Sequence, residues 1–99
     1  MNKFIEKLTG MTDLTDQVIA TDILIAAKSE VRNYALAITE TASPAVRETL
    51  TKQLDEAIDF HEQMTNYMID NGYYYPNDTK KQLELNLKTA DTALNLANN

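Results

Sequence analysis

Glycine and proline are so scarce in this chain that they indicate in advance where its turns lie. Two glycines and two prolines interrupt 99 residues, at Gly10, Pro44, Gly72 and Pro76. Between them, apolar residues recur with the three- and four-residue spacing of amphipathic helices, and no stretch alternates as a strand does. A fold that depends on glycine, such as a phosphate-binding loop or a hairpin-rich barrel, is therefore excluded. We expect each of the four residues to lie at a helix boundary.

Start and stop signals divide the chain into four predicted helices. Hydroxyl and acidic side chains cap helix starts, proline favours the first helical position, and glycine favours the residue just past the end. The predicted elements are a short N-terminal helix over residues 1–8 that stops at Gly10, a long helix from a cap at Thr12 or Asp13 to about residue 41, a second long helix from Ser43 and Pro44 to Asn71 and Gly72, and a last helix capped by Asn77 or Asp78 and reaching residue 97.

These elements predict an all-α fold with one domain over residues 1–99. The loop near residue 42 is short, which makes the first two long helices antiparallel. We therefore expect an up-down bundle of three long helices plus the short N-terminal helix. Three helices of unequal length rarely close a core, so we also expect a homo-oligomer, a dimer in the simplest case. The last helix supports this with apolar residues spaced by 4, 3, 4 and 3, namely Leu83, Leu87, Ala90, Leu94 and Ala97.

Composition and charge exclude several classes of function. The chain has no cysteine, which rules out disulfides and thiolate chemistry. Its net charge of −6 is unfavourable for nucleic acid, whose phosphates are bound by Lys and Arg. The most apolar run, residues 18–27, is about half as long as the ~20 residues that cross a bilayer and contains Asp22. Because no basic segment precedes an apolar one, we expect no secretory signal, no membrane span and a cytoplasmic protein.

Four side chains raise the question of a metal site in the bundle: Glu30, Asp59, His61 and Glu62. Ferritin-like di-iron proteins place Glu and Glu-x-x-His on facing helices. Here residue 58, three before the histidine, is isoleucine, and the chain has no second histidine. We favour a buried His61 that is hydrogen-bonded to Asp22 or to a backbone group, and we expect no cofactor. A single histidine and the lack of a glycine elbow also predict no enzymatic activity.

Two surface features are each open to two interpretations. No Lys or Arg lies between Lys52 and Lys80, and five carboxylates of the second predicted long helix fall in this range: Asp55, Glu56, Asp59, Glu62 and Asp70. This acidic segment is either a solvated face or a docking surface for a basic partner or a cation. The three consecutive tyrosines, Tyr73, Tyr74 and Tyr75, either pack over an open bundle end or form an exposed interaction patch for another protein.

Five segments together are similar in order and spacing to one known family. They are DQVIATDILIAA (residues 16–27), RNYA (32–35), TETASP (39–44), LDEAIDFHEQ (54–63) and residues 67–73. These segments resemble the coat F domain of the spore coat protein F family, found in Bacillus and related spore formers. The closing LNLKTADTALNLA resembles the last helix of that family.

The resemblance implies a ferritin-like helical fold and a structural or assembly role in the spore coat. It also implies other spore coat proteins as partners, and synthesis in the mother-cell cytoplasm before deposition on the coat. It implies no catalytic residues. We favour a non-enzymatic coat protein that self-associates through helix faces. The alternatives are a ferritin-like metal-binding or redox protein that uses the four side chains above, and a regulatory adaptor that binds a basic partner through the acidic segment.

Overall fold

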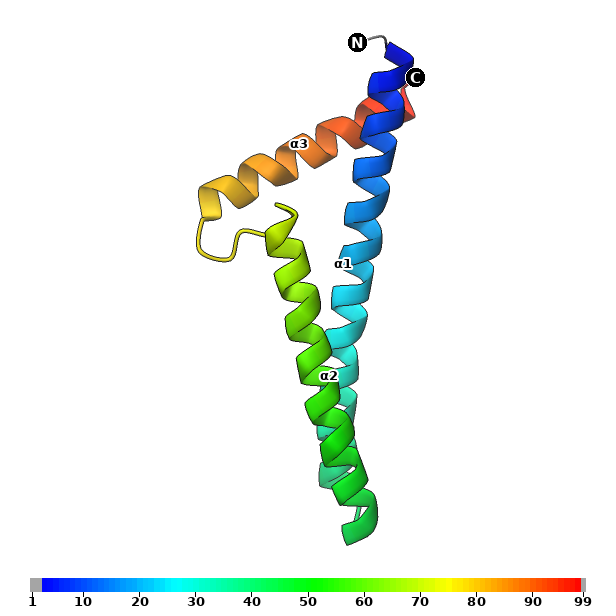
Figure 1. Cartoon of the computed structure of the whole chain (residues 1–99), viewed down its shortest axis with the longest axis vertical. Helices are drawn as coiled ribbons and strands as arrows, with labels where there is room; N and C mark the ends of the chain where they lie inside the picture. Colours follow the sequence, from blue (N-terminus) through cyan, green and yellow to red (C-terminus); the bar gives the residue numbers. More distant parts are fainter. Residues whose placement is uncertain (1–2, 99) are drawn as a thin grey trace. The chain divides into compact units, whose positions relative to one another are not determined.

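The computed structural model describes residues 3–98, and over these residues the chain forms three α-helices and no strand (Figure 1). The helices are α1 (Lys3–Glu40), α2 (Pro44–Asp70) and α3 (Thr79–Ala97). The all-α prediction is therefore confirmed. Met1, Asn2 and Asn99, which belong to the predicted domain, lie outside the described residues. The ferritin-like description of the bundle stays a prediction.

The separate N-terminal helix predicted over residues 1–8 is wrong, because α1 continues through Gly10. A glycine inside a helix costs only about 1 kcal/mol relative to alanine, so one glycine does not end a long helix. The expected cap at Thr12 does not form, since its Oγ1 donates a hydrogen bond to the carbonyl of Leu8 at 3.1 Å within the helix. A Cβ at residue 10 would lie 3.4 Å from Cγ2 of Thr92 on α3, which is an ordinary contact, so the packing of α1 on α3 does not require glycine there.

Both ends of α2 form where the sequence predicts them. Ser43 is the N-cap, and its Oγ accepts a hydrogen bond from the backbone N–H three residues on at 3.4 Å. At the other end Gly72 has a φ of +70°, in the left-handed region that glycine favours. The N–H groups of Gly72 and Tyr73 donate to the carbonyls of Ile69 and Met68, at 3.0 and 2.8 Å. This pair of bonds is a Schellman cap, which satisfies carbonyls that the helix end leaves open.

The start of α3 is also set by a local side-chain bond. Oδ1 of Asp78 accepts a hydrogen bond from the backbone N–H of Lys81 at 3.0 Å. Asp78, rather than Asn77, is therefore the N-cap, and its negative charge lies at the favourable end of the helix dipole. Pro76 lies in the connector between α2 and α3, as expected.

Residues 21–67 form one of two compact units, here called the hairpin unit. In it, the second half of α1 and most of α2 run antiparallel, joined by residues 41–43. The buried side chains of this unit are Ala27 and Ala57. Both stand fifteen residues from Ala42 in the loop, so they lie at the same level of the hairpin. Half-buried side chains continue this narrow core along both helices: Leu24, Val31, Tyr34, Leu54, His61 and Met64.

The second compact unit, here called the terminal unit, combines residues 3–20 with residues 68–98. Its buried side chains are Ala20 and Met68. α3 packs on the first part of α1, where Oγ1 of Thr89 donates a hydrogen bond to Oε1 of Gln17 at 3.2 Å. The side chains of α3 on this packed face are half-buried and partly polar: Gln82, Leu85, Thr89, Thr92 and Leu96.

Candidate assembly surfaces

The four side chains considered for a metal site do not form one among the described residues. Within residues 3–98, the structure brings together no group of three or more His, Asp or Glu side chains that could hold an ion. Glu30 is exposed, and its Oε1 accepts a hydrogen bond from Oη of Tyr34 on the same helix at 3.5 Å. Asp59 and Glu62 are exposed as well. The metal-binding alternative therefore finds no support in this arrangement.

His61 is half-buried in the hairpin unit, so it is less enclosed than the buried position that the sequence predicts. Its backbone carbonyl accepts a hydrogen bond from Oγ1 of Thr65 at 2.9 Å. The expected bond between its ring and Asp22 does not form in the described part of the chain, and Asp22 is exposed. His61 thus contributes to packing in this structure.

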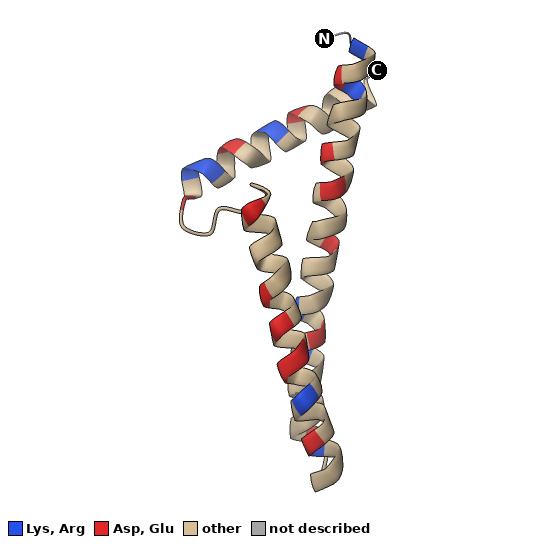
Figure 2. Ribbon diagram, in the orientation of Figure 1, with Lys and Arg blue, Asp and Glu red and all other residues tan. Residues whose placement is uncertain are grey.

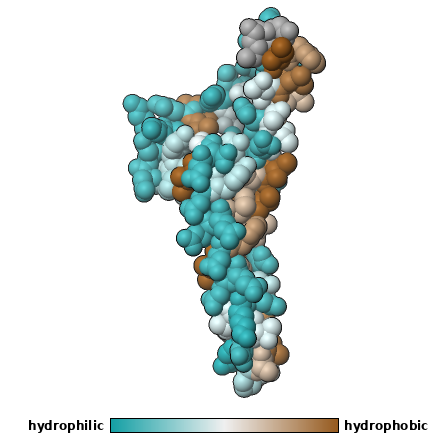
Figure 3. Space-filling model, viewed as in Figure 1, coloured by the Kyte–Doolittle hydropathy of each residue, from teal (hydrophilic) through white to brown (hydrophobic). Residues whose placement is uncertain are grey.

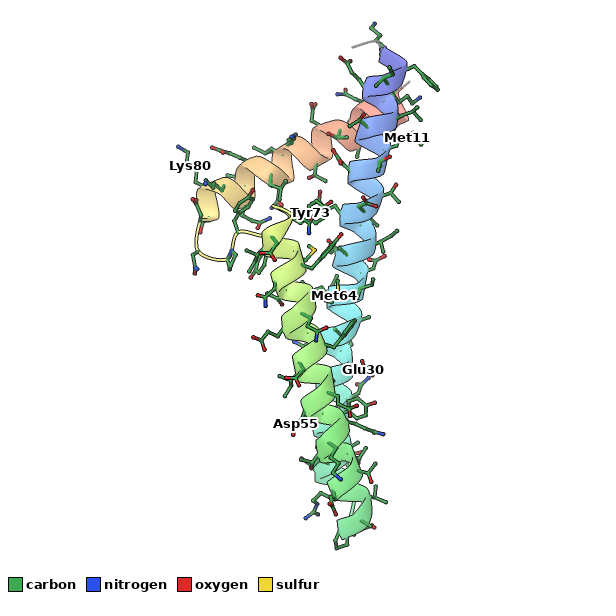
Figure 4. The ribbon with its side chains drawn as sticks, in the orientation of Figure 1. Met11, Glu30, Asp55, Met64, Tyr73 and Lys80 are labelled. Carbon is green, nitrogen blue, oxygen red and sulfur yellow. The ribbon has the colours of Figure 1, made fainter. Side chains whose placement is uncertain are left out.

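The three tyrosines of the connector differ in their surroundings. Tyr73 and Tyr75 are half-buried, and Tyr74 is 38% exposed. Tyr75 is held on both sides, because its N–H donates to Oε1 of Gln82 at 2.7 Å and Nζ of Lys81 lies 6.0 Å from its ring centroid. Tyr73 lies just past the two-residue turn that ends α2 (Figure 4). Tyr73 and Tyr75 are therefore partly packed and Tyr74 is the most accessible member of the triplet, while a contact of these tyrosines with another protein stays a prediction.

An open cavity of about 690 Å³ lies within the terminal unit, between the first part of α1, the connector and α3. Tyr73 and Tyr75 line one part of it. Its charged lining residues are Glu6, Asp13 and Lys88, and threonines of α1 and α3 supply hydroxyls. The lining thus combines carboxylates, one lysine, hydroxyls and tyrosine rings in a cleft between packed helices.

The main apolar row of α3 points away from α1. Leu83, Leu87 and Leu94 are 57%, 63% and 62% exposed, and Ala90 and Ala97 between them are exposed too. We call these five residues the α3 row. α3 packs on α1 through its half-buried face. The α3 row lies on a different face, and no element of the terminal unit covers it.

A second exposed row follows the first part of α1, and the sequence reasoning missed it. Phe4, Leu8, Met11 and Val18, here called the α1 row, are all exposed, with Phe4 at 68%. Figure 3 shows hydrophobic surface along this helix, and Figure 4 labels Met11 on it. The spacing of 4, 3 and 7 was present in the sequence. Dividing the chain at Gly10 concealed it, because the row continues through the glycine.

Charge is distributed unevenly between the helices (Figure 2). Six acidic and two basic residues give residues 43–70 a net charge of −4, while residues 71–99 carry three of each. The carboxylates of the acidic segment are exposed. An ion pair on α2 joins Nζ of Lys52 to Glu48 at 3.8 Å, with both side chains 74% exposed, so it adds little stability.

These features define an all-α protein whose notable surfaces are exposed helix faces and the exposed Tyr74 of the connector. None of the described helices is long and apolar enough to cross a membrane. Residues 15–77 match the family model of the Coat F domain, which is more than half of the chain. The chain therefore belongs to the Coat F domain family, which confirms the resemblance seen in the sequence. The match ends in the connector, so α3 lies beyond it.

Relatives in Bacillus subtilis (strain 168) agree with this membership. The chain is 54% identical over 96 residues to Spore coat protein F-like protein YraD, with 97% of each protein covered. It is 31% identical over 52 residues to Spore coat protein F-like protein YgzC, covering 52% of this chain and 58% of that protein. Spore coat protein F-like protein YhcQ is 31% identical over 65 residues, which cover 66% of this chain and 30% of that protein. No solved structure matches the chain.

Proposed function

We propose that this chain is a non-enzymatic structural protein of the bacterial spore coat. It assembles through exposed helix faces, both with further copies of itself and with other spore coat proteins. It is made in the mother-cell cytoplasm and deposited on the spore coat. Membership of the Coat F domain family supports the setting, as do the relatives, each of which is named a spore coat protein F-like protein.

The observation that carries this proposal is the contrast between a thin core and a large exposed apolar surface. Within the described residues, the buried apolar side chains are three alanines and one methionine: Ala20, Ala27, Ala57 and Met68. The larger apolar side chains of the α1 row and the α3 row remain in contact with water. Each Leu, Ile or Phe that becomes buried contributes about 1.5–3 kcal/mol, so association can be stabilised by apolar surface that folding of one copy leaves exposed.

The hairpin unit of one copy supplies one antiparallel α1–α2 pair, which is half of the four helices in the ferritin-like arrangement that the family resemblance implies. An assembly role also accounts for the exposed helix faces better than catalysis does, because catalytic groups are usually mounted on loops and the loops here are short.

The setting and the assembly are tested by two separate measurements. A fluorescent fusion produced in the mother cell of sporulating B. subtilis should form a ring around the developing spore. Light scattering of the purified chain should give a mass above that of the 11.2 kDa monomer at high micromolar concentration. Diffuse mother-cell fluorescence together with a monomer mass would refute the proposal.

Tyr74 is the residue of the connector that we expect to contact other coat proteins. Replacing Tyr74 with alanine should weaken the fluorescent ring, because an exposed tyrosine offers a large rigid ring and a hydroxyl to a partner. Thermal stability should change by no more than about 0.5 kcal/mol, as expected for an exposed site. The matched control is Phe60→Ala, which removes an exposed ring from α2. Equal ring intensity for wild type and Tyr74→Ala would exclude Tyr74 from the contact.

A further inference from the structure

We propose that the α3 row pairs with the α3 row of a second copy, in antiparallel orientation, and forms the self-association surface of the protein. This inference rests on the proposed self-association and specifies where it occurs and with what geometry. The starting observation is that Leu83, Leu87 and Leu94 are each more than half exposed and lie on one face of one helix. A helix whose main apolar face is exposed in the single chain requires a covering element.

The α3 row has the pattern of a helix-pairing face, and the α1 row does not. Along α3 the apolar residues follow the 4, 3, 4, 3 spacing of a coiled coil without a polar interruption from Leu83 to Ala97. Extending the same spacing along α1 from Leu8 onward places Thr15 and Asp22 in the row. A carboxylate at a paired position would have to leave water without a partner, which opposes association there. The pairing pattern therefore favours α3.

When two copies of α3 run antiparallel, the side chains of one α3 row are complementary in size to those of the other. In the antiparallel register centred between residues 88 and 89, Leu83 faces Leu94 of the second copy and Leu87 faces Ala90 of the second copy. The two copies are then related by a two-fold axis, so each of these contacts occurs twice in the dimer, as a closed dimer requires. Each layer thus combines either two leucines or one leucine with one alanine, so the two helices approach evenly along the row. A second copy of this chain therefore fits the face.

Charge favours both the second copy and the antiparallel orientation. Residues 71–99 carry no net charge, so two copies meet there without the repulsion expected between two acidic α2 helices. Lys80 continues the row at the start of α3 and, in the antiparallel register, faces Ala97 of the second copy. The last turn of α3 carries no basic residue, so its carbonyl dipoles are open to that lysine. A parallel pair would instead place the two Lys80 side chains against each other.

The acidic residues beside the row are compensated within each helix. Glu84 and Asp91 flank the α3 row on one side. Lys88 stands four residues after the first and three residues before the second, which is the spacing at which opposite charges on a helix attract. The flank of the row is therefore close to neutral, and association does not bring an uncompensated pair of acidic clusters together.

Substitution in the row tests its position. Leu87→Glu should weaken self-association by at least about 100-fold, because each dimer loses two leucines from the contact and gains two charges there. The matched control is Ile58→Glu, which places the same charge at an exposed isoleucine of the hairpin unit and should leave the mass by light scattering unchanged. Circular dichroism of Leu87→Glu should still show the helical content of the folded chain, since residue 87 is exposed in one copy.

Pairs of introduced cysteines test the orientation. This test does not depend on whether the Leu87→Glu variant folds. The chain has no cysteine of its own, so each introduced thiol is unique. Mixed under redox exchange, Leu83→Cys and Leu94→Cys should form the mixed disulfide in preference to either homodimer. A preference for the Leu83→Cys homodimer indicates parallel pairing and overturns the proposed orientation.

The possible failures are distinguishable from one another. A folded Leu87→Glu variant that keeps the wild-type mass overturns the α3 interface while leaving self-association and the coat role in place. A wild-type chain that stays monomeric overturns self-association itself, and the fluorescent ring then reports separately on the coat role. The proposal is supported if light scattering gives a lower oligomer mass for Leu87→Glu but not for Ile58→Glu, and if the mixed disulfide forms.

Discussion

Ala27→Leu should lower the free energy of unfolding by about 1–3 kcal/mol, whereas Ala26→Leu should leave it within about 0.5 kcal/mol of wild type. Ala27 is 2% exposed, and Ala57 at the same level of α2 is buried as well. Two alanines at one level allow the helices to lie close together. A leucine at residue 27 would have to push α2 away or adopt a strained rotamer, because packed interiors have no room for three further carbon atoms.

The neighbouring alanine makes this a controlled comparison. Ala26 is exposed on the same helix, and leucine has nearly the helix propensity of alanine. Any difference between the two variants therefore reports packing against α2 rather than a change in α1 itself. Urea denaturation followed by circular dichroism, at one fixed protein concentration, measures both values. Equal stabilities would show that Ala27 does not lie at a close contact between the helices.

Alanine should have opposite effects at the two glycines of the chain. Gly72→Ala should destabilise the protein by about 1–2 kcal/mol, because residue 72 has a φ of +70° and side chains are disfavoured in that region. The added methyl group would also lie 3.1 Å from the hydroxyl of Tyr75, which would have to move. The Schellman cap at the end of α2 depends on this backbone conformation, so the loss should appear as fraying of α2 and displacement of the connector.

Gly10→Ala should stabilise the protein by about 0.5–1 kcal/mol, since alanine restricts the unfolded chain and favours the helix. Its methyl group would lie 3.4 Å from Cγ2 of Thr92, an ordinary contact that adds to the packing of α1 on α3. Thermal unfolding of the two variants beside wild type measures both effects. Destabilisation by Gly10→Ala would mean that α1 and α3 are too close at this level to admit a methyl group, or that α1 does not continue through residue 10.

The helix boundaries that the sequence predicted correctly all depend on local interactions. Ser43 caps α2 through a backbone N–H three residues away, and Asp78 does the same for α3. The Schellman cap at Gly72 spans the residues from Met68 to Tyr73. Such bonds join residues that are close in the chain and do not depend on tertiary contacts, so residue type and spacing are sufficient to predict them.

The incorrect boundary at Gly10 has a physical explanation of the same kind. Glycine ends a helix only where the chain adopts the left-handed conformation, and nothing local enforces that conformation at residue 10. Helical residues on both sides outweigh the modest cost of one glycine. Gly72 and Gly10 are the same residue type, yet the first has a φ of +70° and ends α2, whereas the second lies inside the continuous helix α1. Composition could not distinguish them.

The candidate surfaces were predicted only in part. Periodicity alone identified the α3 row, and inspection of the triplet identified the tyrosines. Which of the tyrosines is exposed depends on where Gln82 and Lys81 lie, and those contacts form only once the connector is folded back on α3. The metal alternative depended on side chains of two helices meeting, and the described residues do not bring them together.

By itself the sequence determined that the chain is all helical, where α2 begins and ends, where α3 begins, and which family it belongs to. Each of these depends on short-range bonds, on the period of apolar residues, or on similarity along the chain. Only the tertiary structure decided that α1 is continuous and that α3 packs through Leu85, Leu96 and polar residues while its leucine row stays exposed. The reason is that a helix with two apolar faces can pack through either one, and the neighbouring helix selects the face.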